Sequence, residues 1–130
     1  HYRGGIEIFK KNKIIGSGFK TFRFECKNDK KKNISCPSHP HNIYIELLSD
    51  TGSIGLIIFL ILNFFIIFKF FRYKLFKDQS STIFFSAFIA IIFPLKPHGS
   101  LFSTNNAFMI WFILSFLIWS IIKKNEKRKN

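Results

Sequence analysis

Three apolar runs joined by short polar links constrain the fold of this chain more than any other feature of its sequence. The first run, Ile54–Phe71, has 18 residues, and only Asn63 and Lys69 interrupt it as polar residues. As a helix it is roughly 27 Å long, close to the thickness of the hydrocarbon core of a bilayer. Lys69 can extend its amine to water from the end of such a helix, and we expect Asn63 to hydrogen-bond a neighbouring helix.

The second and third runs repeat the pattern. The second, Thr82–Leu95, has 14 residues, which is short for a span, and Pro94 suits the end of a helix. The third, Leu101–Ile122, has good capping residues at 104–106 and carries Trp119 near its far end, where aromatic side chains gather at a membrane surface. We therefore expect an all-α fold: a polytopic membrane helix bundle with an extracytoplasmic loop that carries short helices.

Basic residues set the expected orientation. The link Lys69–Lys77 has four Lys or Arg residues and the tail 123–130 has five. Two spans separate these segments, so both lie on one side, and their basic excess marks that side as the cytoplasm. Residues 1–50 carry ten basic residues, but long loops contribute weakly to this bias. The expected segments are a periplasmic loop region with short amphipathic helices at 1–52, transmembrane helices at 53–72, 80–95 and 104–122, a cytoplasmic loop at 73–79, a periplasmic loop at 96–103 and a cytoplasmic basic tail at 123–130.

The formal net charge of +13 does not indicate binding to nucleic acid. The basic clusters flank apolar blocks, and they do not line one face with interleaved aromatic residues. Phe, Ile, Lys and Asn dominate, as an AT-rich genome would give, so a surplus of lysine needs no special function. The chain begins with His1 and reads as part of a longer protein, and its polar first 50 residues show no signal peptide.

The stretch "SCPSHPHN", residues 35–42, is the most polar cluster and stands shortly before the first apolar run. Pro40 disfavours helix at His39, and Asn42 is a good N-cap for a short amphipathic helix that follows it. A helix N-terminus favours anions such as phosphate and keeps an imidazole neutral. Because a neutral imidazole can act as a base near pH 7, His39 and His41 are candidates for acid–base chemistry.

Two other interpretations of this cluster stay open. The histidines can be ordinary loop residues, with Asn42 as a plain helix cap. The cluster can also bind a metal through a C-x2-H-x-H pattern, although the proline between the histidines and the expected oxidation of the cysteines disfavour this. The candidate metal ligands are Cys36, His39 and His41, with Cys26 or His98 as a fourth.

Both cysteines, Cys26 and Cys36, fall in the segment expected outside the cytoplasm. A pair ten positions apart readily forms a disulfide there. Closing so short a loop stabilises a fold by about 2–3 kcal/mol. We therefore expect a Cys26–Cys36 disulfide that tethers the chain just before the histidines.

Two stretches resemble the C-terminal part of the O-antigen ligase and polymerase family. "GSGFKTF", followed by Arg23, is similar to the G-x-G-x-x-x-F segment that precedes the family's large periplasmic loop. "HPHNIYIELLSDTGSIGLIIFL" is similar to the His-Asn pair that ends this loop and to the aliphatic helix, acidic residue, Thr-Gly pair and span that follow, with Asp50 where Glu is commoner. "KPHGSLFSTNNAFMIWF" resembles the last periplasmic loop and final span. The matching positions are Gly16, Gly18, Phe22, His41, Asn42, Leu48, Asp50, Thr51, Gly52 and Gly55.

The resemblance implies transfer of a lipid-linked glycan at the periplasmic face of a bacterial inner membrane. The donor would be an undecaprenyl-pyrophosphate glycan, and the acceptor would be the lipid A core in a ligase or another repeat unit in a polymerase. The transfer would invert the anomeric carbon and need no metal or other cofactor. The partners would be these substrates, membrane lipids and further upstream helices of a longer protein. The implied site residues are His41 as the base, Arg23 and Arg3 as pyrophosphate contacts, and Asn42 and His39 as further substrate contacts.

The alternative is a non-catalytic polytopic membrane protein, such as a permease segment, in which HPHN only caps a helix. A permease would sooner place polar groups within its spans. Asn63 is the only strongly polar residue deep in the first span, and this favours the enzyme.

Overall fold

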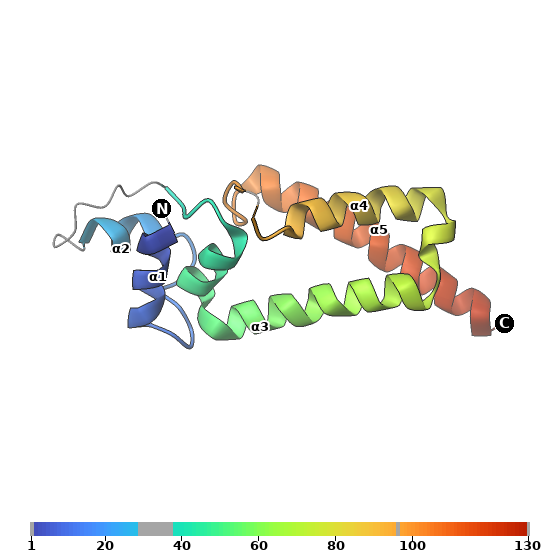
Figure 1. Ribbon diagram of the computed structural model, residues 1–130, viewed down its shortest axis with the longest axis horizontal. Coiled ribbons are helices and arrows are strands. Elements are labelled where there is room, and N and C mark those ends of the chain that lie inside the picture. Colours follow the sequence, from blue (N-terminus) through green and yellow to red (C-terminus); the bar gives the residue numbers. More distant parts are fainter. Residues whose placement is uncertain (1, 29–37, 96, 130) are drawn as a thin grey trace. The chain divides into compact units, whose positions relative to one another are not determined.

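The computed structural model describes residues 2–28, 38–95 and 97–129, and in these ranges the regular structure is helical, without strands. The expected all-α fold is therefore confirmed. The chain divides into two compact units: unit 1 comprises His1–Phe59 and Pro94–Asn106, and unit 2 comprises Leu60–Phe93 and Ala107–Asn130. The helices in chain order are α1 (Tyr2–Lys11), α2 (Phe22–Asn28), α3 (Ile43–Arg72), the short 3-10 helix η1 (Leu75–Lys77), α4 (Gln79–Ile92) and α5 (Thr104–Lys129) (Figure 1).

Helix α3 consists of two parts that meet at a kink. Gly52 has φ 67° and ψ −164°, a backbone conformation essentially restricted to glycine. The part before the kink is the short amphipathic helix that follows HPHN, and it carries the acidic residues Glu46 and Asp50. The part after the kink is the first apolar run. The kink thus separates the polar end of α3 from the segment suited to a membrane.

Helices α4 and α5 differ from the expected bounds at their ends. Asp78 caps α4 by accepting a hydrogen bond from the Ser81 N–H (2.8 Å), so the helix starts at Gln79. It ends at Ile92 because Phe93, which precedes Pro94, is extended, as residues before proline usually are. Helix α5 continues through the basic tail, whose Lys, Glu and Arg residues are good helix formers.

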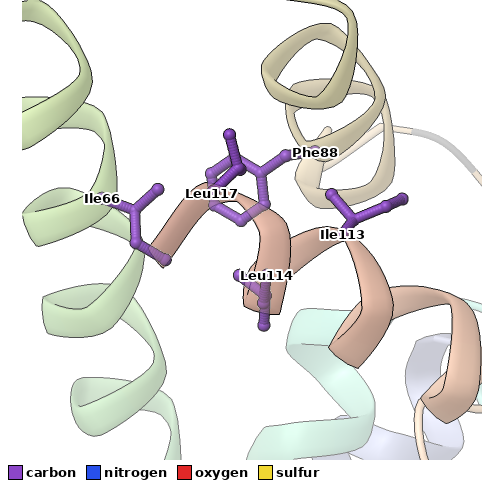
Figure 2. Packing of buried hydrophobic residues seen from close by; sticks show 5 residues of the cluster. All are labelled: Ile66, Phe88, Ile113, Leu114 and Leu117. Carbon is purple, nitrogen blue, oxygen red and sulfur yellow. The ribbon is translucent and has the colours of Figure 1, made fainter. Parts of the chain in front are cut away.

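Unit 2 is held together by a small apolar core. Ile66 of α3 and Phe88 of α4 pack with Ile113, Leu114 and Leu117 of α5 (Figure 2). Around this core, partly buried residues such as Phe84 and Phe85 complete the packing. If the core lies among lipid tails, its stability comes from close van der Waals contact and not from removal of water, since lipid is as apolar as the side chains.

Two helices, α3 and α5, are long and apolar enough to cross a membrane, while α4, with 14 residues, is shorter. Only 17% of the most apolar window of α3 and 22% of that of α5 is buried inside the protein. A core helix of a soluble protein would be mostly buried, so the exposed apolar surface favours a membrane. Exposed apolar residues on the two helices include Ile57, Ile58, Ile61, Phe64, Phe68, Phe108, Trp111 and Ile118.

Candidate functional site

A crossing of two backbone segments organises unit 1. Residues 13–18, which contain the "GSG" turn, run against residues 49–54, which contain the kink of α3. We call this contact the backbone crossing. The N–H groups of Ser17 and Gly18 donate to the carbonyls of Ser49 and Asp50 (2.9 and 3.0 Å), and those of Ser53 and Ile54 donate to the carbonyls of Lys13 and Ile14 (2.9 and 3.2 Å).

Glycine is required on both sides of the backbone crossing. A Cβ atom built on Gly16 would lie 2.5 Å from the carbonyl of Asp50, and one built on Gly52 would lie 2.3 Å from the carbonyl oxygen of Ile14. Both glycines also have positive φ, 72° and 67°. The G-x-G and Thr-Gly motifs are therefore two halves of one feature, because each places a glycine where the other's backbone passes. The sequence suggested a close approach at "GSG" without identifying this partner.

Asp50 is held at the backbone crossing. Its side chain is buried, with a residue exposure of 2%, and accepts hydrogen bonds from the Lys20 N–H (2.9 Å) and the Ser49 hydroxyl (3.2 Å). Burial raises the pKa of Asp50 to about 6, because the loss of water outweighs these two hydrogen bonds. Lys20 has a left-handed φ of 59°, which fits its place in the turn that presents this N–H.

Glu46 lies one helical turn before Asp50 and is also buried. It accepts hydrogen bonds from the Ser100 hydroxyl and from the Leu101 N–H, the latter at 2.7 Å. Burial raises the pKa of Glu46, and its hydrogen bonds and the charges of His98 and Lys20 only partly oppose this. Glu46 therefore joins the loop after α4 to the start of α3.

Asn42 caps α3. Its side-chain oxygen accepts hydrogen bonds from the N–H groups of Tyr44 (3.0 Å) and Ile45 (3.2 Å). Its side-chain N–H group donates to the carbonyl of Pro94 at 2.7 Å. Both ends of the amide are thus engaged within unit 1, and Asn42 ties the segment that begins at Pro94 to the start of α3.

The two histidines of HPHN contact one another. Their ring centroids are 4.2 Å apart, with 49° between the ring planes. His41 has a left-handed φ of 58°, and its carbonyl accepts a hydrogen bond from the His98 N–H (2.9 Å). His39 forms a hydrogen bond through Nδ1 with the Ser38 hydroxyl (2.9 Å). Its Nε2 is buried and has no hydrogen-bond partner among the described residues.

An open cavity of about 530 Å³ brings several of these groups together. Two predicted site residues, Arg23 and His39, line it, whereas Arg3, His41 and Asn42 are not among its described lining residues. Arg23 is exposed at the start of α2, and Arg3 is exposed on α1. We call this cavity the unit 1 groove. Its described lining residues are Lys20, Phe22, Arg23, Phe24, Ser38, His39, Glu46, Asp50, Gly99, Ser100, Ser103 and Asn106.

The polar groove residues that sequence reasoning did not single out include Lys20, Glu46 and Ser100. Glu46 had one available signal, because an acid four residues before Asp50 places two carboxylates on one face of the short helix. No local signal in the sequence pointed to Lys20 or Ser100. Lys20 contacts Asp50, 30 positions away, and Ser100 contacts Glu46, 54 positions away.

The predicted disulfide and the metal alternative both involve Cys36, which lies outside the described residues. Cys26 is buried and packs with Ile8 and Phe22. The Cys26–Cys36 bond stays a prediction. In the part of the chain that the structure describes, no three His, Cys, Asp or Glu residues are grouped closely enough to hold a metal ion.

Comparison with protein families gives a match over the first part of the chain. Residues 1–60 match the family model described as O-Antigen ligase. Comparison with curated proteins and with solved structures gives no match. The matched segment contains both halves of the backbone crossing, the HPHN histidines and the Asn42 cap.

These matched residues build one compact arrangement, and the apolar helices that follow indicate a membrane protein. The match over residues 1–60, together with the helical fold, supports membership of this chain in the O-antigen ligase family, whose function is of the ligase or polymerase type.

Proposed function

We propose that the chain takes part in transfer of a glycan from an undecaprenyl-pyrophosphate donor to a hydroxyl acceptor at the periplasmic face of the inner membrane. The acceptor is the lipid A core if the protein is a ligase and another repeat unit if it is a polymerase. One observation carries the proposal: Arg23 and His39 line the same groove, and both stand within the segment that matches the family.

In the proposed reaction, His41 accepts the proton of the acceptor hydroxyl. The acceptor oxygen then forms a bond to the anomeric carbon as the bond from that carbon to the pyrophosphate oxygen breaks. The configuration inverts, and undecaprenyl pyrophosphate leaves with the bonding electron pair. A general base of this kind contributes typically about 10²–10⁴-fold to the rate.

Arg23 has the chemistry needed for the leaving group. A guanidinium donates two parallel hydrogen bonds to phosphate oxygens and keeps its charge at any physiological pH. Donors placed where charge develops lower the barrier, and the charge here develops on the pyrophosphate. Arg23 is exposed and lines the groove, so a pyrophosphate can reach it. Lys20 adds a second positive charge to the same lining.

A second assignment gives the base role to His39, and a specific observation favours it. His39 lines the groove, and its buried Nε2 has no hydrogen-bond partner among the described residues. Buried ring nitrogens usually have a hydrogen-bond partner, so an acceptor hydroxyl is a candidate partner for this one. The resemblance assigns the base to His41, whose ring lies against that of His39.

Replacement of each histidine by alanine in the intact protein separates the two assignments. We expect His41→Ala to lower glycan transfer by about 10²–10⁴-fold and His39→Ala to have a milder effect. The measurement is the amount of glycan joined to the acceptor in cells that lack the chromosomal gene, at matched protein levels. His98→Ala is the control, because the resemblance gives His98 no role in transfer and its hydrogen bond to the His41 carbonyl is made by the main-chain N–H, which alanine keeps.

The reverse order, with His39→Ala inactive and His41→Ala nearly normal, would move the base role to His39. Near-normal transfer in both variants would leave Asn42 as a plain cap and end the catalytic interpretation of HPHN. Arg23→Lys should impair turnover although it keeps the charge, since the two-pronged contact is lost. Arg72→Lys in unit 2 is the matched control.

A further inference from the structure

Unit 2 contains a basic pocket that glycan transfer does not use. It has a volume of about 510 Å³ and is formed by η1, the start of α4 and the end of α5. Three lysines, Lys74, Lys124 and Lys127, also line a second pocket of about 460 Å³, to which Arg72 and Arg128 contribute. The five lysines of the first pocket are Lys74, Lys77, Lys123, Lys124 and Lys127.

The surroundings of these lysines are fixed by packing. Phe70, Leu75 and Ile121 form a buried cluster that joins the end of α3, η1 and the end of α5. The Tyr73 hydroxyl donates to the side-chain oxygen of Asn125 at 3.0 Å, which ties the link after α3 to α5. The lysines therefore stand on a defined set of helix ends and not on a free tail.

Among the described lining residues of this pocket there is one acid, Asp78, and it does not neutralise the lysines. Its carboxylate accepts a hydrogen bond from the Ser81 N–H (2.8 Å) as the cap of α4. Five lysines against one aspartate leave a strong positive excess. Because like charges so close together repel, a bound anion would stabilise this arrangement.

The pocket is also partly apolar. Leu75, Phe116 and Trp119 line it beside the lysines, and the Lys123 amine lies 4.6 Å from the centre of the Trp119 ring. Trp119 stands near the end of the apolar part of α5, the position that tryptophan favours at the surface of a bilayer. A free anion would use only the lysines, whereas an anion attached to hydrocarbon would use both kinds of lining.

We propose that this pocket binds the phosphate headgroup of an anionic membrane phospholipid, with Lys74, Lys124 and Lys127 as the main contacts. Basic pockets between the ends of membrane helices bind such headgroups in other proteins. The site is independent of the proposed glycan transfer.

The test measures lipid binding to the intact protein in detergent by native mass spectrometry, with phosphatidylglycerol and phosphatidylcholine added in separate titrations. Each basic residue near a lipid surface is worth about fivefold in affinity. Replacement of Lys74, Lys124 and Lys127 by Gln should therefore weaken phosphatidylglycerol binding on the order of 10²-fold. It should leave phosphatidylcholine binding unchanged. The control variant replaces Lys11, Lys13 and Lys27 of unit 1 by Gln, which removes the same charge, and should bind as the unchanged protein does.

Two further arms complete the test. Replacement of the same three lysines of unit 2 by Arg should keep binding, which separates loss of charge from loss of fold. Inorganic phosphate at millimolar concentration should not displace the lipid. Equal weakening by both Gln variants would show a diffuse charge effect and overturn the site, as would equal affinity for the two lipids. Displacement by inorganic phosphate would assign the pocket to a soluble anion and overturn the lipid.

Discussion

The carboxylate of Asp50 is buried, and this burial raises its pKa to about 6. The unfolded chain holds this group near its ordinary pKa of 3.8. Because the folded pKa is higher, the folded state binds more protons between about pH 4 and pH 6. The contribution of Asp50 to stability is therefore fully present below about pH 4 and is lost as the pH rises through about 6.

The resulting prediction concerns Asp50→Asn. We expect the thermal midpoint of the unchanged protein in detergent to rise as the pH is lowered from 7 to 4. In Asp50→Asn this rise should be smaller, and it should shrink again when Glu46→Gln is added, since burial raises that pKa too. The measurement is the midpoint, followed by tryptophan fluorescence, across this pH range.

Asp78→Asn is the control for this experiment. Asp78 is exposed, and its pKa is lowered by its hydrogen bonds to Ser81, so the sign of its linkage is opposite. Its contribution is present above the ordinary pKa and is lost as the pH falls. An unaltered pH dependence in Asp50→Asn would contradict the assignment of the raised pKa to this residue.

At the scale of elements, the backbone crossing makes the kink of α3 part of the site. Gly52 has a backbone conformation that other residues avoid, and its Cα faces the carbonyl of Ile14. The crossing in turn holds Asp50 and, through it, the Lys20 turn next to Arg23. Damage to the crossing should therefore affect folding and the groove together.

We expect Gly52→Ala to destabilise the protein by about 1–3 kcal/mol from backbone strain alone, with more from the clash of the new Cβ. Gly4→Ala is a matched control. A Cβ on Gly4 would meet no atom closer than 3.5 Å, and alanine is the better helix former inside α1. Thermal midpoints of both variants test this, and equal midpoints would refute the role of the backbone crossing.

The sequence predicted the helices better than it predicted the contacts between segments that are far apart in the chain. The helices and the Asn42 cap depend on local periodicity and on neighbours three or four residues away, so they are visible in the sequence. The groove is formed by contacts such as that of Glu46 with Ser100, which are 54 residues apart. A single sequence contains no local signal for such a pair. The resemblance identified Gly16 and Gly52 as matching positions. The structure gives the reason: each glycine leaves room for the backbone of the segment that contains the other.

At the scale of the whole molecule, the exposed apolar helices and the family match indicate a membrane protein, and the sides of the membrane stay a prediction. We expect residues 1–50 to face the periplasm and both basic segments, around 69–77 and 123–130, to face the cytoplasm. The excess of Lys and Arg in the two segments separated by two spans is the basis for this orientation.

Single cysteines introduced at Ser38, Lys77 and Lys127 test the orientation, with Cys26 and Cys36 replaced by serine. An impermeant thiol reagent added to intact spheroplasts should label Ser38→Cys and leave Lys77→Cys and Lys127→Cys unlabelled until the membrane is opened. Lys77→Cys serves as the internal check, since it should behave as Lys127→Cys does. Labelling of Ser38→Cys and Lys127→Cys from the same side would refute the topology.

The backbone crossing also bears on how the chain can diverge in evolution. Its four main-chain hydrogen bonds use atoms that nearly every amino acid has, and the hydroxyls of Ser17 and Ser53 add bonds to the carbonyls of Ser49 and Lys13 (2.9 and 2.8 Å). Ile14 and Ile15 expose most of their side chains, at 65% and 73%, so their identity contributes little to the contact. Natural selection should therefore preserve Gly16 and Gly52 and permit drift at Ile14 and Ile15, so that distant descendants keep this architecture with different side chains at those two positions.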